Sequence, residues 1–120
     1  MSKSISFQGS LQISGDGLSL ALSKSTTLTQ TGAESTAQTQ SIGTGAAELL
    51  DISADIATPG WLFVLNTDAT NYVELSLNDF TQKFAKLRAG EWCFLPVSTN
   101  TIYAKANTGA CVVEFLAVEF

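Results

Sequence analysis

Residues 61–120 read WLFVLNTDATNYVELSLNDFTQKFAKLRAGEWCFLPVSTNTIYAKANTGACVVEFLAVEF. Short apolar runs in this stretch alternate with turn residues, and the runs are 61–65, 72–77, 84–87, 92–95, 101–104 and 111–118. Short runs at this regular spacing are typical of the strands of a small all-β sandwich or barrel. We therefore expect an all-β chain that folds as a single antiparallel β-sandwich, jelly-roll-like, with roughly eight to ten strands.

The same sequence lacks the residues from which most active sites are built. It contains no histidine, which is the commonest general base and metal ligand. Two isolated cysteines cannot complete a tetrahedral zinc site, and the Gly43-Thr44-Gly45 pair is followed by no basic residue that could hold a phosphate. The carboxylates form no conspicuous pair. We therefore predict that the protein is not an enzyme, and we assign no catalytic, cofactor-binding or metal-binding residue.

Composition indicates which partners the surface can have. Charged residues make up 14% of the chain, against roughly 25% in an average globular protein, so we expect protein partners to cover part of the surface. The net charge is −5 and no polybasic cluster occurs, which argues against nucleic acid as a partner. No apolar run approaches the roughly 18 residues of a membrane span. The start of the chain lacks an apolar signal core, so synthesis in the cytoplasm is expected.

The first 45 residues differ from the rest in composition. Apolar and polar residues alternate over 5–13 and again over 18–22, around the turn Gly15-Asp16-Gly17, which predicts a hairpin. Residues 23–44 are rich in Ser, Thr and Gln, which is typical either of disorder or of exposed strands and extended arms. Threonine favours strands, so we favour the arm. Of the eleven aromatic residues only Phe7 precedes position 61. We expect one folded domain overall, in which residues 1–45 form N-terminal strands and a Ser/Thr-rich arm or hairpin and residues 46–120 form the sandwich body.

Three further features each admit two interpretations. Cys93 and Cys111 are flanked by apolar residues, which favours buried free thiols; a disulfide would require that their strands be neighbours. Oxygen-bearing side chains near the loops suit either turn capping, which we favour, or calcium, and these are Asp68, Asn71 and Asp79. Aromatic side chains suit either core packing, which we favour, or stacking on sugar rings, and these are Trp61, Trp92 and Tyr103.

Several segments of the second half resemble the small structural proteins of tailed bacteriophages. The segments that carry the resemblance are Thr58-Pro59-Gly60-Trp61, residues 66–74, residues 84–91, Leu95-Pro96, residues 102–106 and residues 113–119. These segments are spread over residues 58–119, about half of the chain, and residues 1–45 lie outside the resemblance.

The resemblance implies a virion component on the capsid surface, a cement or decoration protein with a β-sandwich fold. Its expected partners are the major capsid protein, whose joints it would bridge, and further copies of itself, with a trimer favoured and a dimer possible. No catalytic residue comes with the resemblance. Two alternatives stay open at this point: a tail or head-fibre structural module, and a carbohydrate-binding β-sandwich.

Overall fold

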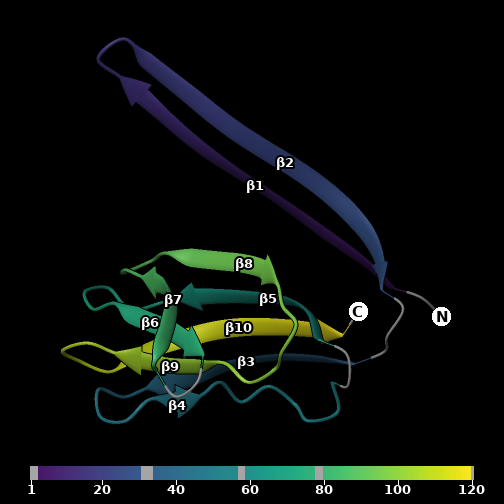
Figure 1. The fold of residues 1–120 in the computed structure, drawn as a ribbon, viewed down its shortest axis with the longest axis vertical. Helices are drawn as coiled ribbons and strands as arrows, with labels where there is room; N and C mark the ends of the chain where they lie inside the picture. Colours follow the sequence, from purple (N-terminus) through teal and green to yellow (C-terminus); the bar gives the residue numbers. More distant parts are fainter. Residues whose placement is uncertain (1–2, 31–33, 57–58, 78–79, 120) are drawn as a thin grey trace. The chain divides into compact units, whose positions relative to one another are not determined.

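The computed structural model describes residues 3–30, 34–56, 59–77 and 80–119. Within these ranges the chain forms ten strands and no helix, and every strand pair is antiparallel, which confirms the all-β prediction (Figure 1). No helix capable of crossing a membrane occurs in the described part of the chain. The chain divides into two compact units, Met1–Ala33 and Glu34–Phe120.

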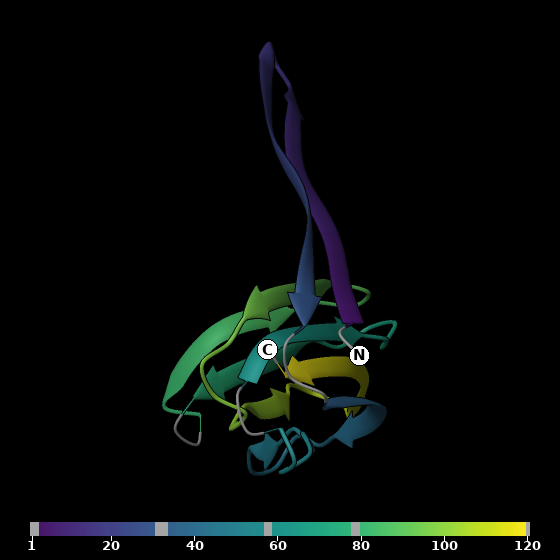
Figure 2. The ribbon, with the colours of Figure 1, turned by 90° about the vertical axis from the view of Figure 1, so that its right-hand side faces the viewer.

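The first unit is a long β-hairpin. Strand β1 (Lys3–Gly15) pairs with β2 (Leu18–Gln30) in one uninterrupted register, from Lys3 opposite Gln30 to Gly15 opposite Leu18. The two turn residues between them, Asp16 and Gly17, have φ angles of 49° and 78°, as a tight turn matched to the right-handed strand twist requires. Figure 2 shows this twist along the hairpin. The predicted hairpin is confirmed, and β2 runs further than predicted, to Gln30.

The second unit contains two sheets of four strands. One has the order β3-β10-β5-β8, and its strands are β3 (Ser35–Ile42), β10 (Cys111–Glu119), β5 (Pro59–Asn66) and β8 (Trp92–Pro96). Strand β5 is apolar on both faces and lies between two neighbours. Strand β8 lies at the edge and ends at Pro96, where a missing backbone N–H costs no ladder hydrogen bond.

The other sheet has the order β4-β9-β6-β7. Its strands are β4 (Glu48–Leu49), β9 (Tyr103–Ala106), β6 (Val73–Leu77) and β7 (Gln82–Leu87). Inward-facing side chains of both sheets form one hydrophobic core, to which Leu50 and Ile56 contribute from the segment between β4 and β5. The strand members of this core are Ile42, Leu62, Val64, Val73, Leu75, Leu87, Ala104, Ala106, Cys111, Val113, Phe115 and Ala117.

The boundary between the units lies after Ala33, not after residue 45 as the composition indicated. Strand β3 pairs with β10 along its whole length, and its last residue, Ile42, is fully buried in the core. The polar side chains of β3 have structural partners as well: Gln40 donates to Leu49 O (2.9 Å) and accepts from Asp51 N (2.9 Å). The Ser/Thr/Gln-rich segment is therefore divided, with part of it in the hairpin and part in the body.

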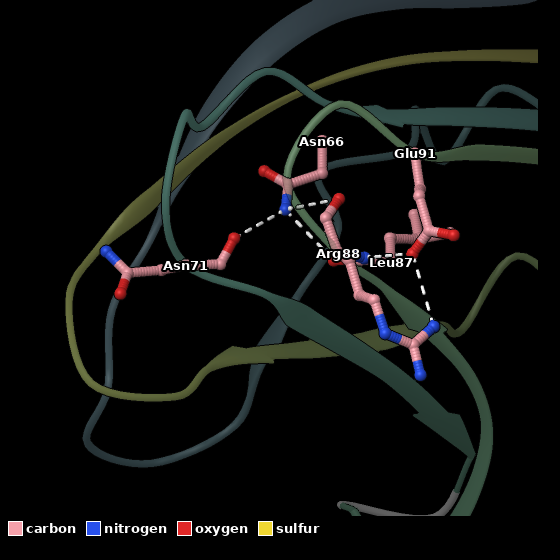
Figure 3. A network of polar contacts seen from close by, with 5 residues as sticks. All are labelled: Asn66, Asn71, Leu87, Arg88 and Glu91. Carbon is pink, nitrogen blue, oxygen red and sulfur yellow. Dashed lines mark hydrogen bonds and ion pairs between the residues drawn. The ribbon is translucent and has the colours of Figure 1, made fainter.

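A buried asparagine fixes the end of β5. Asn66 is 0% exposed, and its Nδ2 donates to the carbonyl oxygens of Leu87 (2.9 Å), Asn71 (3.0 Å) and Arg88 (3.2 Å), as Figure 3 shows. Its Oδ1 accepts from Asp68 N at 3.0 Å. Because a buried polar group without partners is costly, this network ties the loop after β5 to the turn between β7 and β8.

Candidate functional site

One face of the β1–β2 hairpin is apolar and exposed. The register places Leu11 opposite Leu22 and Ile13 opposite Leu20, and cross-strand partners lie on the same face of a ladder. The four side chains are 69%, 76%, 52% and 56% exposed, in that order. Toward the chain ends the same face continues with half-buried Ile5, Phe7 and Leu28. We call these seven residues the hairpin face.

The opposite face of the hairpin carries Ser, Thr and Gln, with Ala21 as its apolar member. A two-stranded ribbon has no second layer of its own, so it is marginally stable unless something covers its apolar face. Single apolar residues scattered over a surface need no explanation. A contiguous apolar strip on one side of a ribbon whose other side is polar marks an interaction surface. The hairpin therefore has one apolar side, which suits contact with another molecule, and one polar side, which suits contact with water.

The outer face of the sheet β3-β10-β5-β8 is a second apolar surface. Alternation along β10 points Val112, Leu116 and Val118 away from the core, and the register places the last two opposite Phe63 and Trp61. Trp92 stacks on Phe63 (ring centroids 5.6 Å apart) and on Phe94 (5.8 Å). We call this surface the outer face; its apolar members are Trp61, Phe63, Leu65, Trp92, Phe94, Val112, Leu116 and Val118.

Each of the two faces carries a charged residue near its centre. Lys24 lies opposite Gly9, the middle residue of β1, and its side chain is exposed. Glu114 lies between Val112 and Leu116 on the outer face, and it is exposed as well. Within the described parts of the chain neither residue makes an ion pair. Lys24 and Glu114 thus give the two faces opposite charges, each beside apolar side chains.

The three aromatic residues predicted for core packing do not share that role. Trp92 is 49% exposed on the outer face, so its predicted core position is wrong. Trp61 is half-buried on the same face, and Tyr103 is half-buried in the other sheet. Strand β8 is apolar on both sides, and the residues themselves do not indicate which side faces the core. The structure therefore does not bring the three rings together as one sugar-stacking site.

The loop carboxylate considered for calcium caps its own turn. Asp68 Oδ2 accepts from Thr70 N (2.9 Å) and from Asn71 N (2.6 Å), as the turn-capping interpretation predicts. These amides, that of Asn71 first, lower the pKa of Asp68 below its ordinary value of 3.8. Asp79 lies outside the described residues. In the described ranges no three Asp, Glu or Cys side chains gather in a metal-binding arrangement.

The two cysteines are free thiols. Cys111 is fully buried between β3 and β5, and Cys93 is half-buried on the core side of β8. Burial raises the pKa of Cys93, and burial together with the nearby Asp68 carboxylate raises that of Cys111. Because the thiolate is the nucleophilic form, both residues serve as small apolar core groups.

The basic side chains in the segment 83–88 contact acidic or aromatic side chains nearby. Lys83 lies 3.7 Å from Glu74 and over the ring of Phe80 (4.6 Å). Lys86 lies over the ring of Tyr72 at 4.0 Å. The Arg88 side chain pairs with Glu91, which also accepts from Arg88 N at 2.7 Å. These contacts hold strands and turns of the body, so this group does not form a converging basic patch.

Comparison of the chain with protein-family models, with curated proteins and with solved structures finds no match. The hairpin face and the outer face are accordingly the features on which a functional interpretation must rest. The sequence signal for the hairpin face was its strict alternation. The sequence signal for the outer face was that the runs 61–65 and 111–118 contain apolar residues at both odd and even positions. Only one face of each strand packs in the core, so the apolar residues on the other face exceed what the core requires.

Proposed function

We propose that the protein is a non-enzymatic structural protein of a bacteriophage particle, a capsid cement or decoration protein that binds between subunits of the shell. The observation that carries the proposal is the hairpin face, where four large aliphatic side chains are more than half exposed on one side of a ribbon whose other side is polar. Such a surface suits flat, extended contacts with a protein partner. The segments of the body that resemble phage structural proteins support the same assignment.

We infer further that the body is a jelly-roll β-sandwich and the hairpin its extended N-terminal arm. The strand orders β3-β10-β5-β8 and β4-β9-β6-β7 support this inference. In an eight-stranded double-sheet jelly roll, two Greek keys produce two antiparallel sheets whose neighbouring strands are far apart in sequence. A body of this kind is a rigid block, and the arm supplies reach.

The proposed partners are the major capsid protein and further copies of this chain, with a trimer favoured over a dimer. The protein would be made in the host cytoplasm and would act on the capsid surface. A charged fraction of 14% suits a chain much of whose surface is covered. Many copies on a symmetric shell turn individually weak contacts into firm attachment.

A shell-binding experiment tests this function. Leu11 and Leu22 face each other on the hairpin face, and Gln12 and Ala21 form the next pair, on the polar face. We expect Leu11→Ser/Leu22→Ser to lose most binding to purified shells of the phage that encodes the chain, and Gln12→Ser/Ala21→Ser to bind as the wild type does. Absence of shell binding by the wild type, at concentrations where it is folded and soluble, contradicts the proposed function.

Two other functions remain as competing outcomes. The stack of Phe63, Trp92 and Phe94, in which Trp92 is 49% exposed, also suits a carbohydrate-binding surface, because sugar rings pack on exposed aromatic faces. Binding to a glycan array that Trp92→Ala abolishes would favour that function. Localisation of the protein to the tail or to head fibres by electron microscopy would favour a fibre module.

A further inference from the structure

We propose that the outer face of the sheet β3-β10-β5-β8 binds the hairpin face of a second copy of the chain. The proposal rests on the homo-oligomer of the proposed function and names the two surfaces that form it. Leu22 on one surface and Trp92 on the other are 76% and 49% exposed. Removing apolar surfaces of this kind from water lowers the free energy and so favours association.

The central charges identify which faces meet. Lys24 lies at the midpoint of the hairpin, so symmetric packing of two hairpin faces brings two lysines together whether the ribbons run parallel or antiparallel. Packing of two outer faces similarly brings two Glu114 carboxylates together. Two like charges brought together in an interface from which water is excluded raise the free energy of binding, whereas Lys24 over Glu114 forms an ion pair. Opposite charge therefore favours contact between unlike faces over contact between like ones.

The dimensions of the two faces agree with such a contact. A two-stranded ribbon is roughly 10 Å wide, and the nine residues of β10 span roughly 30 Å. One hairpin on one outer face thus covers roughly 300 Å² on each surface, or roughly 600 Å² in total. Stable interfaces bury about 1,200 to 2,000 Å². One contact is too small, but releasing one copy from a closed dimer or a closed trimer breaks two contacts, which together bury roughly 1,200 Å².

Contact between unlike faces is compatible with a closed ring. Each copy donates one hairpin and receives one, so the contact is head-to-tail, and head-to-tail contacts either close into rings or grow into filaments. The number of contacts equals the number of copies in a ring. Every hairpin face and every outer face is then occupied, with no copy left exposing either surface.

Charge reversal in solution, without shells, tests the pairing of Lys24 with Glu114. We expect Lys24→Glu alone and Glu114→Lys alone each to weaken self-association about tenfold or more in sedimentation equilibrium, because each creates a like-charge contact. The double variant should return to within about threefold of the wild type. Both residues are exposed, so the variants should fold, and circular dichroism checks this. Single variants that associate like the wild type, or a double variant no better than either single one, overturn the proposal.

A cross-linking experiment separates a second copy from the chain's own sheet. Chains with Lys24→Cys are mixed with chains with Glu114→Cys and treated with a short bis-maleimide, and each variant alone controls for the native cysteines. We expect a covalent dimer only in the mixture. No dimer in the mixture, combined with internal cross-linking of a dilute chain that carries both substitutions, overturns the proposal in favour of self-closure.

The two proposals can fail separately. Loss of shell binding by Leu11→Ser/Leu22→Ser without any cross-link between copies means that the hairpin binds the capsid directly, which overturns the hairpin exchange and leaves the function standing. Cross-linked copies that ignore shells overturn the function and leave the exchange standing.

Discussion

Two truncations that differ only in residues 34–45 should have very different effects on the stability of the body. Removal of residues 1–33 takes away the hairpin unit and leaves every member of the hydrophobic core, which begins at Ile42. Removal of residues 1–45 also deletes strand β3. We expect the shorter truncation to leave the thermal unfolding midpoint of the body nearly unchanged and the longer one to abolish its stable fold.

The magnitude follows from what β3 contributes. Ile42 is 0% exposed, and loss of a buried side chain of this size costs about 2–5 kcal/mol. Gln38 and Gln40 donate and accept three hydrogen bonds with the backbone of residues 49–51, each worth about 1 kcal/mol. A body of roughly 90 residues is stable by about 4–13 kcal/mol. A loss above about 5 kcal/mol lowers the midpoint by about 20 °C or more, and for many proteins of this size it means unfolding.

Circular dichroism melts of the full chain and both truncations provide the measurement, with tryptophan fluorescence as a second probe of the body. The point variant Ile42→Ala in the full chain is the matched control, and it should lower stability by about 2–5 kcal/mol. Equal midpoints for the two truncations would mean that β3 does not belong to the body. Unfolding of both would mean that the hairpin is part of the core, and either result refutes the reasoning.

Further predictions concern the polar groups of the body. Asn66→Ala should lower stability by about 3 kcal/mol because it strips several buried or half-buried backbone groups of their partner; Asn100→Ala, which removes a single 3.3 Å bond to Ile56 O, should cost much less in the same urea titration, and equal costs would contradict the role of the network. The depressed pKa of Asp68 makes its contribution complete above 3.8, its ordinary value, and lost as the pH falls through the lower folded value. The difference in thermal midpoint between the wild type and Asp68→Asn should therefore become smaller as the pH is lowered from about 6 to about 2. A difference that stays constant over this range would refute the capping account. Because burial raises the pKa of Cys93 and Cys111, both should react with iodoacetamide at about pH 8 far more slowly in the folded protein than in urea; rapid labelling of the folded chain would show that the thiols are accessible.

The strands of the second half and the hairpin could be predicted from the sequence because local periodicity determines them. The runs 61–65 and 92–95 became β5 and β8, and the turn Gly15-Asp16-Gly17 sits between two strictly alternating segments. Both signals lie within a window of a few residues. Asp16 and Gly17 adopt positive φ angles, which is what that turn composition favours.

The boundary after Ala33 could not be predicted because β3 has an unusual inner side. Its inward positions include Gln38 and Gln40, whose amides pair with the backbone of a loop that sequence distance does not identify. Polar composition therefore looked like an arm where the chain forms a strand of the body. The exposure of Trp92 escaped prediction for the converse reason: a strand that is apolar on both sides does not reveal which side the second sheet covers.

The central claim is that the protein cements a capsid and that its apolar hairpin face is covered in the assembled shell. A cryo-electron microscopy map of the phage particle tests it most directly. The account predicts density for this chain on the outer surface of the shell, at joints between major capsid subunits, with Leu11 and Leu22 of each copy covered by a neighbouring subunit. Density confined to the tail, or copies on the shell whose hairpin faces stand open to solvent, would contradict it.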